Sequence, residues 1–255
     1  MSESGAGQAR WVDAGSMPWQ AAGLGELTAK PLVMPSPGGV YVGFTRFPRG
    51  GEIPHHRHVG DEFIYVTEGL VEDDGGTLWP GWASYRPVGC THSVRSAEGA
   101  TVLVVATGTS VPASATEKSR SSHPLAPPTF ARSASQAAGV AGAELFSVPA
   151  PDGGAARRAL LLQVAAGSAL DLPQADSERV CLIIEGRMTQ AWEGGAGMGP
   201  SWFCRLRPLQ DASAVAMLET TLLLIEWADC SPHAGTAATK SGAESIWPSL
   251  PDRES

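Results

Sequence analysis

Short runs of β-branched and aromatic residues, bounded by Gly, Pro or Asp, recur along both halves of the chain. Such runs are typical of β-strands, whose side chains pack on a pleated, half-buried surface. Turn-forming stretches such as 48–51 and 73–76 separate them at the roughly 8 to 12 residues expected of sandwiches and barrels. No segment before residue 110 shows helical periodicity. The pattern predicts an all-β protein with strands at residues 40–47, 61–67, 101–107, 159–164, 180–184 and 221–225.

A stretch rich in Ser, Ala and Pro interrupts the strand pattern between residues 111 and 139. Its composition buries too little apolar surface to offset the entropy lost on ordering, so we expect a linker there. The chain then divides into an N-terminal domain over residues 1–110 and a C-terminal domain over residues 140–230. The polar residues 231–255 are expected to form a tail.

The two halves resemble each other. Gly50 precedes the run Phe63–Gly69, and Gly167 precedes the run Val180–Gly186, with an offset of 117 residues in both cases. Further on, 85–87 matches 206–208 at an offset of 121, and a four-residue insertion in the glycine-rich loop 194–197 accounts for the change. This self-similarity predicts a tandem duplication of one β-domain.

Composition narrows the classes of partner. The 255 residues include 18 Lys and Arg and 26 Asp and Glu, a formal net charge of −8, with no basic stripe. We therefore expect neither nucleic acid nor a membrane as a partner. No run reaches the roughly 18 apolar residues of a membrane span, and the N-terminus lacks the pattern of a signal peptide. With four widely spaced cysteines, these features favour a cytoplasmic protein.

Four of the six histidines fall in two short windows, His55, His56 and His58 in one and His92 in the other. His56 and His58 are two residues apart, so both side chains leave the same face of a strand. Glu62 follows after a turn, and His92 begins a later strand. Three imidazoles and one carboxylate suit a single divalent transition metal with positions left open for water, substrate or dioxygen. We predict His56, His58, Glu62 and His92 as its ligands.

The same residues match the two sequence motifs of the cupin superfamily. The first motif reads Gly50-x5-His56-x-His58-x3-Glu62-x6-Gly69, and the second reads Gly81-x5-Pro87-x-Gly89-x2-His92. Ser96 stands where the second motif usually ends in Asn, a departure that affects a turn and no ligand. The flanking residues most resemble ChrR-like cupins, which include the sensor half of an anti-sigma factor and relatives of acetylacetone-cleaving dioxygenases. The resemblance covers residues 30–108 and implies a double-stranded β-helix, or jelly-roll, so that the repeat implies two tandem barrels.

In the second half, the offsets place Pro173, Ala175 and Arg179 at the positions of His56, His58 and Glu62, and Ser213 at that of His92. We therefore expect a degenerate cupin without metal ligands that supports the structure or a homodimer, since barrel closure needs only apolar strands and turn glycines.

Several aromatic and polar residues on or beside the strands of the first barrel are candidates for lining a pocket. Cys90 is included because it lies two residues before His92 and could contact that histidine on the side away from the metal. The candidate pocket residues are Tyr41, Arg46, Tyr65, Trp82, Tyr85 and Cys90. No residue is assigned as a separate general base.

Two main functions fit the resemblance. The first is a mononuclear dioxygenase, with iron(II) favoured over zinc, manganese or nickel, acting on a small enolisable or oxygenated substrate. The second is a ChrR-like metal-binding sensor or regulatory module without turnover, although the chain shows no N-terminal helical segment with paired Cys and His. A storage or binding protein is a third possibility.

Overall fold

The computed structural model describes residues 9–34, 40–116, 123–126, 139–148, 157–190 and 197–227. These residues form antiparallel β-strands and turns, without a helix, which confirms the predicted fold class. Within the same residues there is accordingly no helix that could span a membrane. By internal contacts, the chain divides into two compact units.

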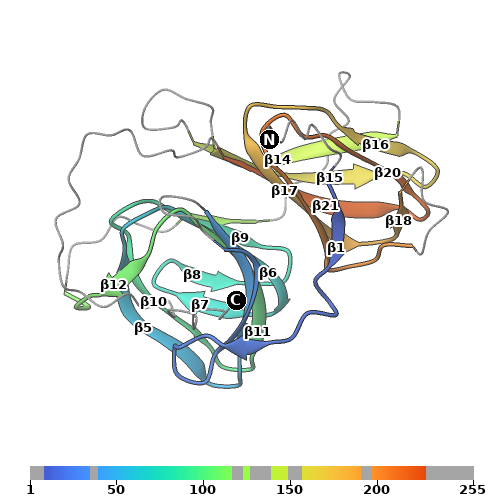
Figure 1. The fold of residues 1–255 in the computed structure, drawn as a ribbon. Helices are drawn as coiled ribbons and strands as arrows, with labels where there is room; N and C mark the ends of the chain where they lie inside the picture. The colour runs from blue at the N-terminus through green and yellow to red at the C-terminus, as the bar shows by residue number, and fades with distance from the viewer. Residues whose placement is uncertain are drawn as a thin grey trace, which may run out of the picture. The chain divides into compact units, whose positions relative to one another are not determined.

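The first unit covers residues 18–127 and is built from two curved sheets around one interior (Figure 1). The larger sheet has the order β13-β9-β6-β11-β4-β3-β2, and the smaller one has the order β12-β5-β10-β7-β8. The strands are β2 (Gln20–Ala21), β3 (Thr28–Val33), β4 (Tyr41–Phe47), β5 (Gly51–His58), β6 (Glu62–Gly69), β7 (Val71–Asp73), β8 (Gly76–Leu78), β9 (Ala83–Arg86), β10 (Thr91–Ser96), β11 (Ala100–Ala106), β12 (Ser110–Pro112) and β13 (His123–Leu125).

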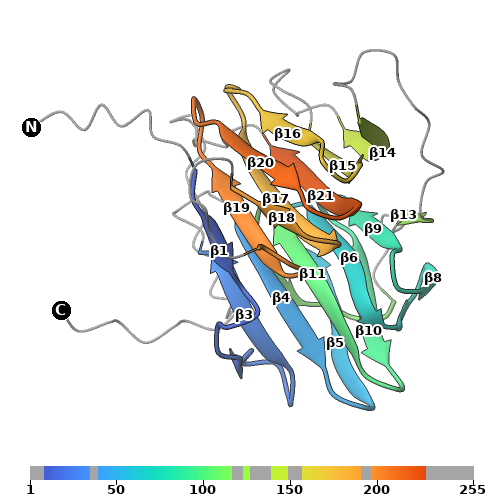
Figure 2. The same ribbon diagram turned by 90° about the vertical axis from the view of Figure 1, so that its right-hand side faces the viewer.

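The core of this first barrel lies between the two sheets. Strand β11 is buried along its whole length and pairs with β4 on one side and β6 on the other, as Figure 2 shows. Its residues Val102 and Val104 face inward and pack with Ile64, Phe47 and Val94. Burying each such side chain contributes about 1.5 to 3 kcal/mol, so the interior strands hold the barrel together.

The second unit is a smaller pair of sheets, with the strand orders β1-β19-β17-β21-β15-β14 and β16-β20-β18. Its interior is lined by aliphatic residues, Trp11, two methionines and two cysteines. The strands are β1 (Trp11–Asp13), β14 (Val140–Val148), β15 (Arg157–Val164), β16 (Ala169–Leu172), β17 (Glu178–Glu185), β18 (Met188–Thr189), β19 (Trp202–Leu206), β20 (Ala212–Ala216) and β21 (Thr220–Trp227).

The division of the chain differs from the expected boundaries at two places. The N-terminal strand β1 pairs with β19, so it belongs to the second unit and not to the first. The expected linker 111–139 contains the end of β12, which pairs with β5, and the whole of β13, which pairs with β9. Short strands at a sheet edge need only backbone pairing, which composition does not reveal. The expected tail 231–255 lies outside the described residues.

The backbone of the two units carries the same irregularities at matching positions. A bulge interrupts the pairing of β6 with β11 at Thr67, and an equivalent bulge interrupts the pairing of β17 with β21 at Ile184, 117 residues later. The next turns hold Gly69 and Gly186 at φ of 68° and 93°. A Cβ on either glycine would lie 2.1 or 2.3 Å from a backbone oxygen, so both positions require glycine. Bulges are characteristic features of a fold, and this coincidence supports the predicted duplication.

Cys181 and Cys204 face each other across β17 and β19, and both are fully buried, as is Cys90 in the first barrel. Burial raises the pKa of Cys204 to about 12 and also raises that of Cys181, whose pKa is raised further by the neighbouring Cys204. A thiol with a pKa near 12 has roughly three thousandfold less thiolate at neutral pH than one near 8.5.

We predict that a Cys230→Ser variant, in which only the three described cysteines remain, is nearly inert to a disulfide reagent such as DTNB at pH 8 while folded. Denaturant should expose all three thiols at once. The rate of thiolate release, followed by absorbance with and without denaturant, measures the difference. A rapid reaction of the folded variant would contradict the buried positions of these thiols.

Candidate metal centre

Strand β5 delivers two histidines to the interior of the first barrel. His56 and His58 alternate with the exposed Arg57, so both rings are buried on the inner face. The turn after β5 is pressed against residues 107–109, where a Cβ on Gly60 would lie 2.4 Å from the backbone nitrogen of Gly108. Because Gly60 has no Cβ, the two backbone segments can approach this closely and the chain can reverse within a few residues. Strand β6 then begins at Glu62, close to the histidines.

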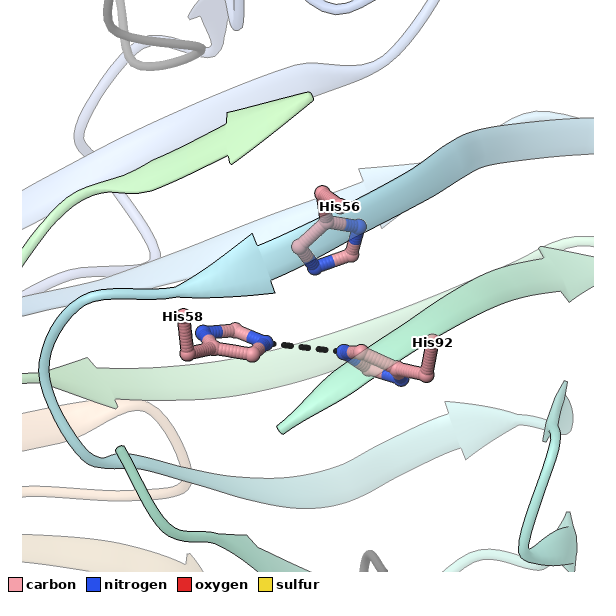
Figure 3. A group of neighbouring side chains, drawn as sticks. All are labelled: His56, His58 and His92. Carbon is pink, nitrogen blue, oxygen red and sulfur yellow. Dashed lines mark hydrogen bonds between the residues drawn. The ribbon is translucent and has the colours of Figure 1, made fainter. Parts of the chain in front are cut away.

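The third histidine comes from the neighbouring strand. His92 on β10 lies directly opposite His56 in the antiparallel register. The Nε2 atoms of His58 and His92 are 2.8 Å apart, and the ring of His56 lies 4.8 and 4.5 Å from theirs, centroid to centroid (Figure 3). In the described part of the chain, these three are the residues whose potential ligand atoms gather within 4.8 Å of one another.

Two of the three imidazoles are oriented by a hydrogen bond at Nδ1. His56 Nδ1 donates to the backbone carbonyl oxygen of Pro54 at 2.9 Å. His58 Nδ1 lies 3.2 Å from the hydroxyl of Ser110, and His92 Nδ1 lies 3.7 Å from a carboxylate oxygen of Asp73. His56 and His58 thus bond through Nδ1 outside the cluster and keep Nε2 for an ion, an arrangement common among metal-binding histidines, whereas His92 Nδ1 has no hydrogen-bond partner.

The protonation state of the cluster suits a metal. Burial lowers the pKa of His56, and it lowers the pKa of His58 to about 4 and that of His92 to about 3. The rings are therefore neutral near pH 7, the form that offers a lone pair. The 2.8 Å between Nε2 atoms is close to the roughly 3 Å that separates adjacent imidazole nitrogens on one ion at about 2.1 Å. The three histidines could thus hold a transition metal ion.

Glu62 is placed differently from the histidines. Its carboxylate lies 3.7 Å from His58 Nε2 and accepts a hydrogen bond of 2.8 Å from Arg86, which is completely buried. Burial opposes its ionisation, but His58 and Arg86 lower its pKa to about 2, so Glu62 is an anion. Arg86 also donates to Asp73 at 2.8 Å. The structure therefore brings Glu62 to the edge of the cluster, where Arg86 competes for the oxygen that the predicted metal would need.

Comparisons with known proteins agree with this architecture. Residues 7–111 match the ChrR cupin-like domain family. A candidate dioxygenase from Nostoc punctiforme has a similar structure, with a TM-score of 0.69, 14% identity, and coverage of 89% of this chain and 85% of that one. Salicylate 1,2-dioxygenase from Pseudaminobacter salicylatoxidans is also similar, with a TM-score of 0.63, 15% identity and coverage of 87% and 84%.

The Escherichia coli pirin YhhW, in complex with nickel(II), shares the fold as well, with a TM-score of 0.59, 12% identity, and coverage of 87% of this chain and 99% of that one. No curated protein matches the chain at a significant level. Residues 7–111 belong to the cupin superfamily. At these low identities, the likeness to the solved structures establishes the fold of this chain. It does not establish the reaction, because one fold can host many activities.

The second barrel of this cupin has different charges at the matching positions. Arg179 is the second residue of β17 and Glu62 is the first residue of β6, close to the correspondence that the 117-residue offset predicts. In the strand register, Leu206 and Glu226 lie opposite Arg179, where Arg86 and Ala106 lie opposite Glu62. In the strand pairing of β16 with β20, Ser213 lies opposite Asp171.

A cavity opens beside the histidines in the interior of the first barrel. Apart from His56, its walls come mainly from aliphatic and aromatic residues of both sheets. The lining consists of Leu24, Thr45, Phe47, Ile53, His56, Glu62, Ile64, Arg86, Val94, Val102, Val104 and Ser110.

None of the six residues predicted to line a pocket belongs to this lining. Arg46 is exposed on the opposite face of β4, where its guanidinium stacks 4.0 Å from the ring centroid of Trp19. Tyr41 and Trp82 are partly buried against the hydrophobic core. The remaining candidates also pack in or on the strands, with Tyr65 and Cys90 buried and Tyr85 half-buried. Aromatic residues on alternating strands face either way, and sequence alone did not distinguish the inner face from the outer.

Sequence reasoning also missed residues that orient the cluster. Arg86 and Ser110 each contact a predicted ligand, and Asp73 approaches His92, yet none was singled out as a site residue. Arg86 immediately precedes Pro87 of the second cupin motif, so its position was visible. An arginine at the end of a mostly buried strand can indicate a buried ion pair, because such a charge is rarely buried without a partner.

We predict that Arg86→Met lowers the free energy of unfolding of the first barrel by about 3 to 5 kcal/mol, because it leaves two buried carboxylates without their shared cation. Urea denaturation followed by tryptophan fluorescence measures the loss.

The control is Arg49→Met, which removes an exposed ion pair with Glu98 of comparable length, 2.6 Å. Exposed pairs are worth about 0 to 1 kcal/mol, so this variant should unfold nearly like the wild type. If both variants lowered the free energy of unfolding by the same small amount, the ion pairs of Arg86 would not be needed to stabilise the interior.

Proposed function

We propose that this cupin is a mononuclear metal-dependent dioxygenase that acts on a small enolisable or oxygenated substrate. The observation that carries the proposal is the cluster of three buried, neutral histidines beside an apolar cavity. The likeness to salicylate 1,2-dioxygenase and the match to the ChrR cupin-like family support it. Iron(II) is the ion we favour, because three imidazoles leave coordination positions free for substrate and dioxygen.

In this proposal His56, His58 and His92 hold the ion, and Glu62 stays with Arg86 as an anion beside it. Bound iron(II) would supply Lewis acidity and dioxygen activation. Glu62, Asp73 and Arg86 together carry one negative charge, which offsets part of the charge of a divalent ion in the interior. Ser110 orients His58, the Asp73 carboxylate lies 3.7 Å from Nδ1 of His92, and the aliphatic walls exclude water.

The match to the ChrR cupin-like family also favours a second function, a metal-binding sensor module without turnover. The same three histidines would hold the ion, and a change at the cavity would be passed to a protein partner. The two functions differ in one measurable respect, since only the dioxygenase consumes dioxygen with a substrate.

We predict that His58→Ala and His92→Ala purify with less than about a tenth of the metal that the wild type retains, because each loses one of three ligands. Anaerobic purification followed by elemental analysis measures the metal per chain. His55→Ala is the control, because His55 is partly exposed and lies outside the cluster. Full metal retention without His58 or His92 would refute the proposed centre.

Glu62→Gln separates the two possible ligand sets. If the carboxylate is held by Arg86 and does not bind the ion, the variant should keep metal within about tenfold of the wild-type affinity, the range of a neighbour that only tunes the site. A loss as large as that in His58→Ala would show that the sequence-based prediction of four ligands is correct. Competition with a chelator of known affinity measures the difference.

Dioxygen uptake by the iron-loaded wild type against diketones, phenolic ketones and thiols decides between the two functions. Uptake that depends on both substrate and His92 supports the dioxygenase. Tight metal binding without uptake on any of these compounds favours the sensor.

A further inference from the structure

The cavity beside the histidines contains few polar groups, and they lie in two places. His56, Glu62, Arg86 and Ser110 belong to the region of the predicted metal. Every other lining side chain is apolar except that of Thr45. A ligand in this cavity therefore meets polar groups at the histidines and at one further residue.

At the end of the cavity away from the histidines, the described lining residues offer no cation to a ligand. Arg86 is the one arginine or lysine among them and lies at the histidine end, where its two terminal nitrogens donate to the carboxylates of Glu62 and Asp73 and its Nε is buried without a partner. These three charges sum to −1. A carboxylate on the ligand, away from the metal, would lose its hydration without gaining a partner, which is unfavourable by several kcal/mol. The lining thus disfavours an anionic group on the body of the ligand.

Thr45 presents an unused hydroxyl to this cavity. The residue is 2% exposed, lines the cavity, and its Oγ1 has no hydrogen-bond partner. Buried hydroxyls nearly always have a partner, because leaving one unsatisfied costs about 1 to 3 kcal/mol. A ligand atom that bonds to Thr45 would remove this cost.

Thr45 lies away from the metal-binding end. It pairs with Val102 on β11, whereas Glu62 pairs with Ala106, four residues further along the same strand. Four residues span roughly 13 Å along a strand. The distance between the two side chains inside the cavity is shorter, because both point into the same barrel interior. On the facing sheet, Ile53 and Val94 continue the wall from His56 toward the same end. The histidines and the Thr45 hydroxyl therefore mark two ends of one apolar space.

We propose that the cavity takes a small uncharged molecule with an oxygen at each end, one directed to the metal and the other hydrogen-bonded to the hydroxyl of Thr45. This inference rests on the proposed function, because it takes the cavity as the substrate site. Thr45 is then a substrate-positioning residue, and the enzyme discriminates against substrates that carry a carboxylate at the distal end.

Three ketones with the same five-carbon chain test the proposal, namely 2-pentanone, 5-hydroxy-2-pentanone and levulinate. They differ in carrying a methyl, a hydroxyl or a carboxylate at the distal end. Their dissociation constants are measured by ligand-observed NMR with the zinc-loaded protein and again with metal-free protein. We expect the hydroxyketone to bind roughly threefold to tenfold more tightly than 2-pentanone, as one added hydrogen bond predicts. Levulinate should bind at least about tenfold more weakly than the hydroxyketone.

Thr45→Val removes the hydroxyl and keeps the shape of the side chain. This variant should bind the hydroxyketone no more tightly than 2-pentanone, and Thr45→Ser should restore the preference. Thr101→Val is the matched control, since Thr101 is also buried but its hydroxyl donates to Glu68 outside the cavity lining. It should leave all three constants unchanged.

Preferred binding of levulinate, an unchanged preference in Thr45→Val, or failure of all three ketones to bind would overturn this inference. Metal retention and dioxygen uptake would still stand in that case. Conversely, suppose that the protein retains no metal while the metal-free form still binds the three ketones in the expected order. That result would refute the proposed dioxygenase and support the role of Thr45.

Discussion

The antiparallel pairing of β5 with β10 is the constraint on which the candidate centre depends. It sets His92 opposite His56, and the alternation of β5 sets His58 on the same inner face. Because side chains alternate with a period of two, a slip of one residue would turn a histidine out of the barrel. The register is held by backbone hydrogen bonds on both sides of β5, since β12 pairs with its other edge at His58.

The electrostatic balance of the interior follows from this backbone arrangement. Arg86 enters beside Glu62 because β9 pairs with β6, and it reaches Asp73 at the end of β7. The guanidinium thus holds two carboxylates close to the histidines without exposing any of these charges to water. In the matching place, the second barrel has Arg179, Leu206 and Glu226, so the same strand geometry supports a different set of charges. The fold requires apolar strands and turn glycines, whereas the centre requires particular polar side chains on them.

The fold was largely predictable. The six sequence-predicted strands correspond to β4, β6, β11, β15, β17 and β21, because long apolar runs between turn residues have few other stable conformations. The edge strands β1, β12 and β13 were not predicted, since their residues pair through the backbone and carry no strong hydrophobic pattern. Local sequence also could not show that β1 joins the sheet formed by the end of the chain.

The sequence by itself determined which residue types stand at the candidate centre. The spacing of His56, His58 and His92 within two long motifs identified them, because few other arrangements explain such clustered imidazoles. Only the tertiary structure decided that Arg86 pairs with Glu62, that Arg46 faces outward, and that Thr45 presents an unpaired hydroxyl to the cavity. Each of these depends on which strands are neighbours and which face is buried, and both are set by packing between residues far apart in the chain.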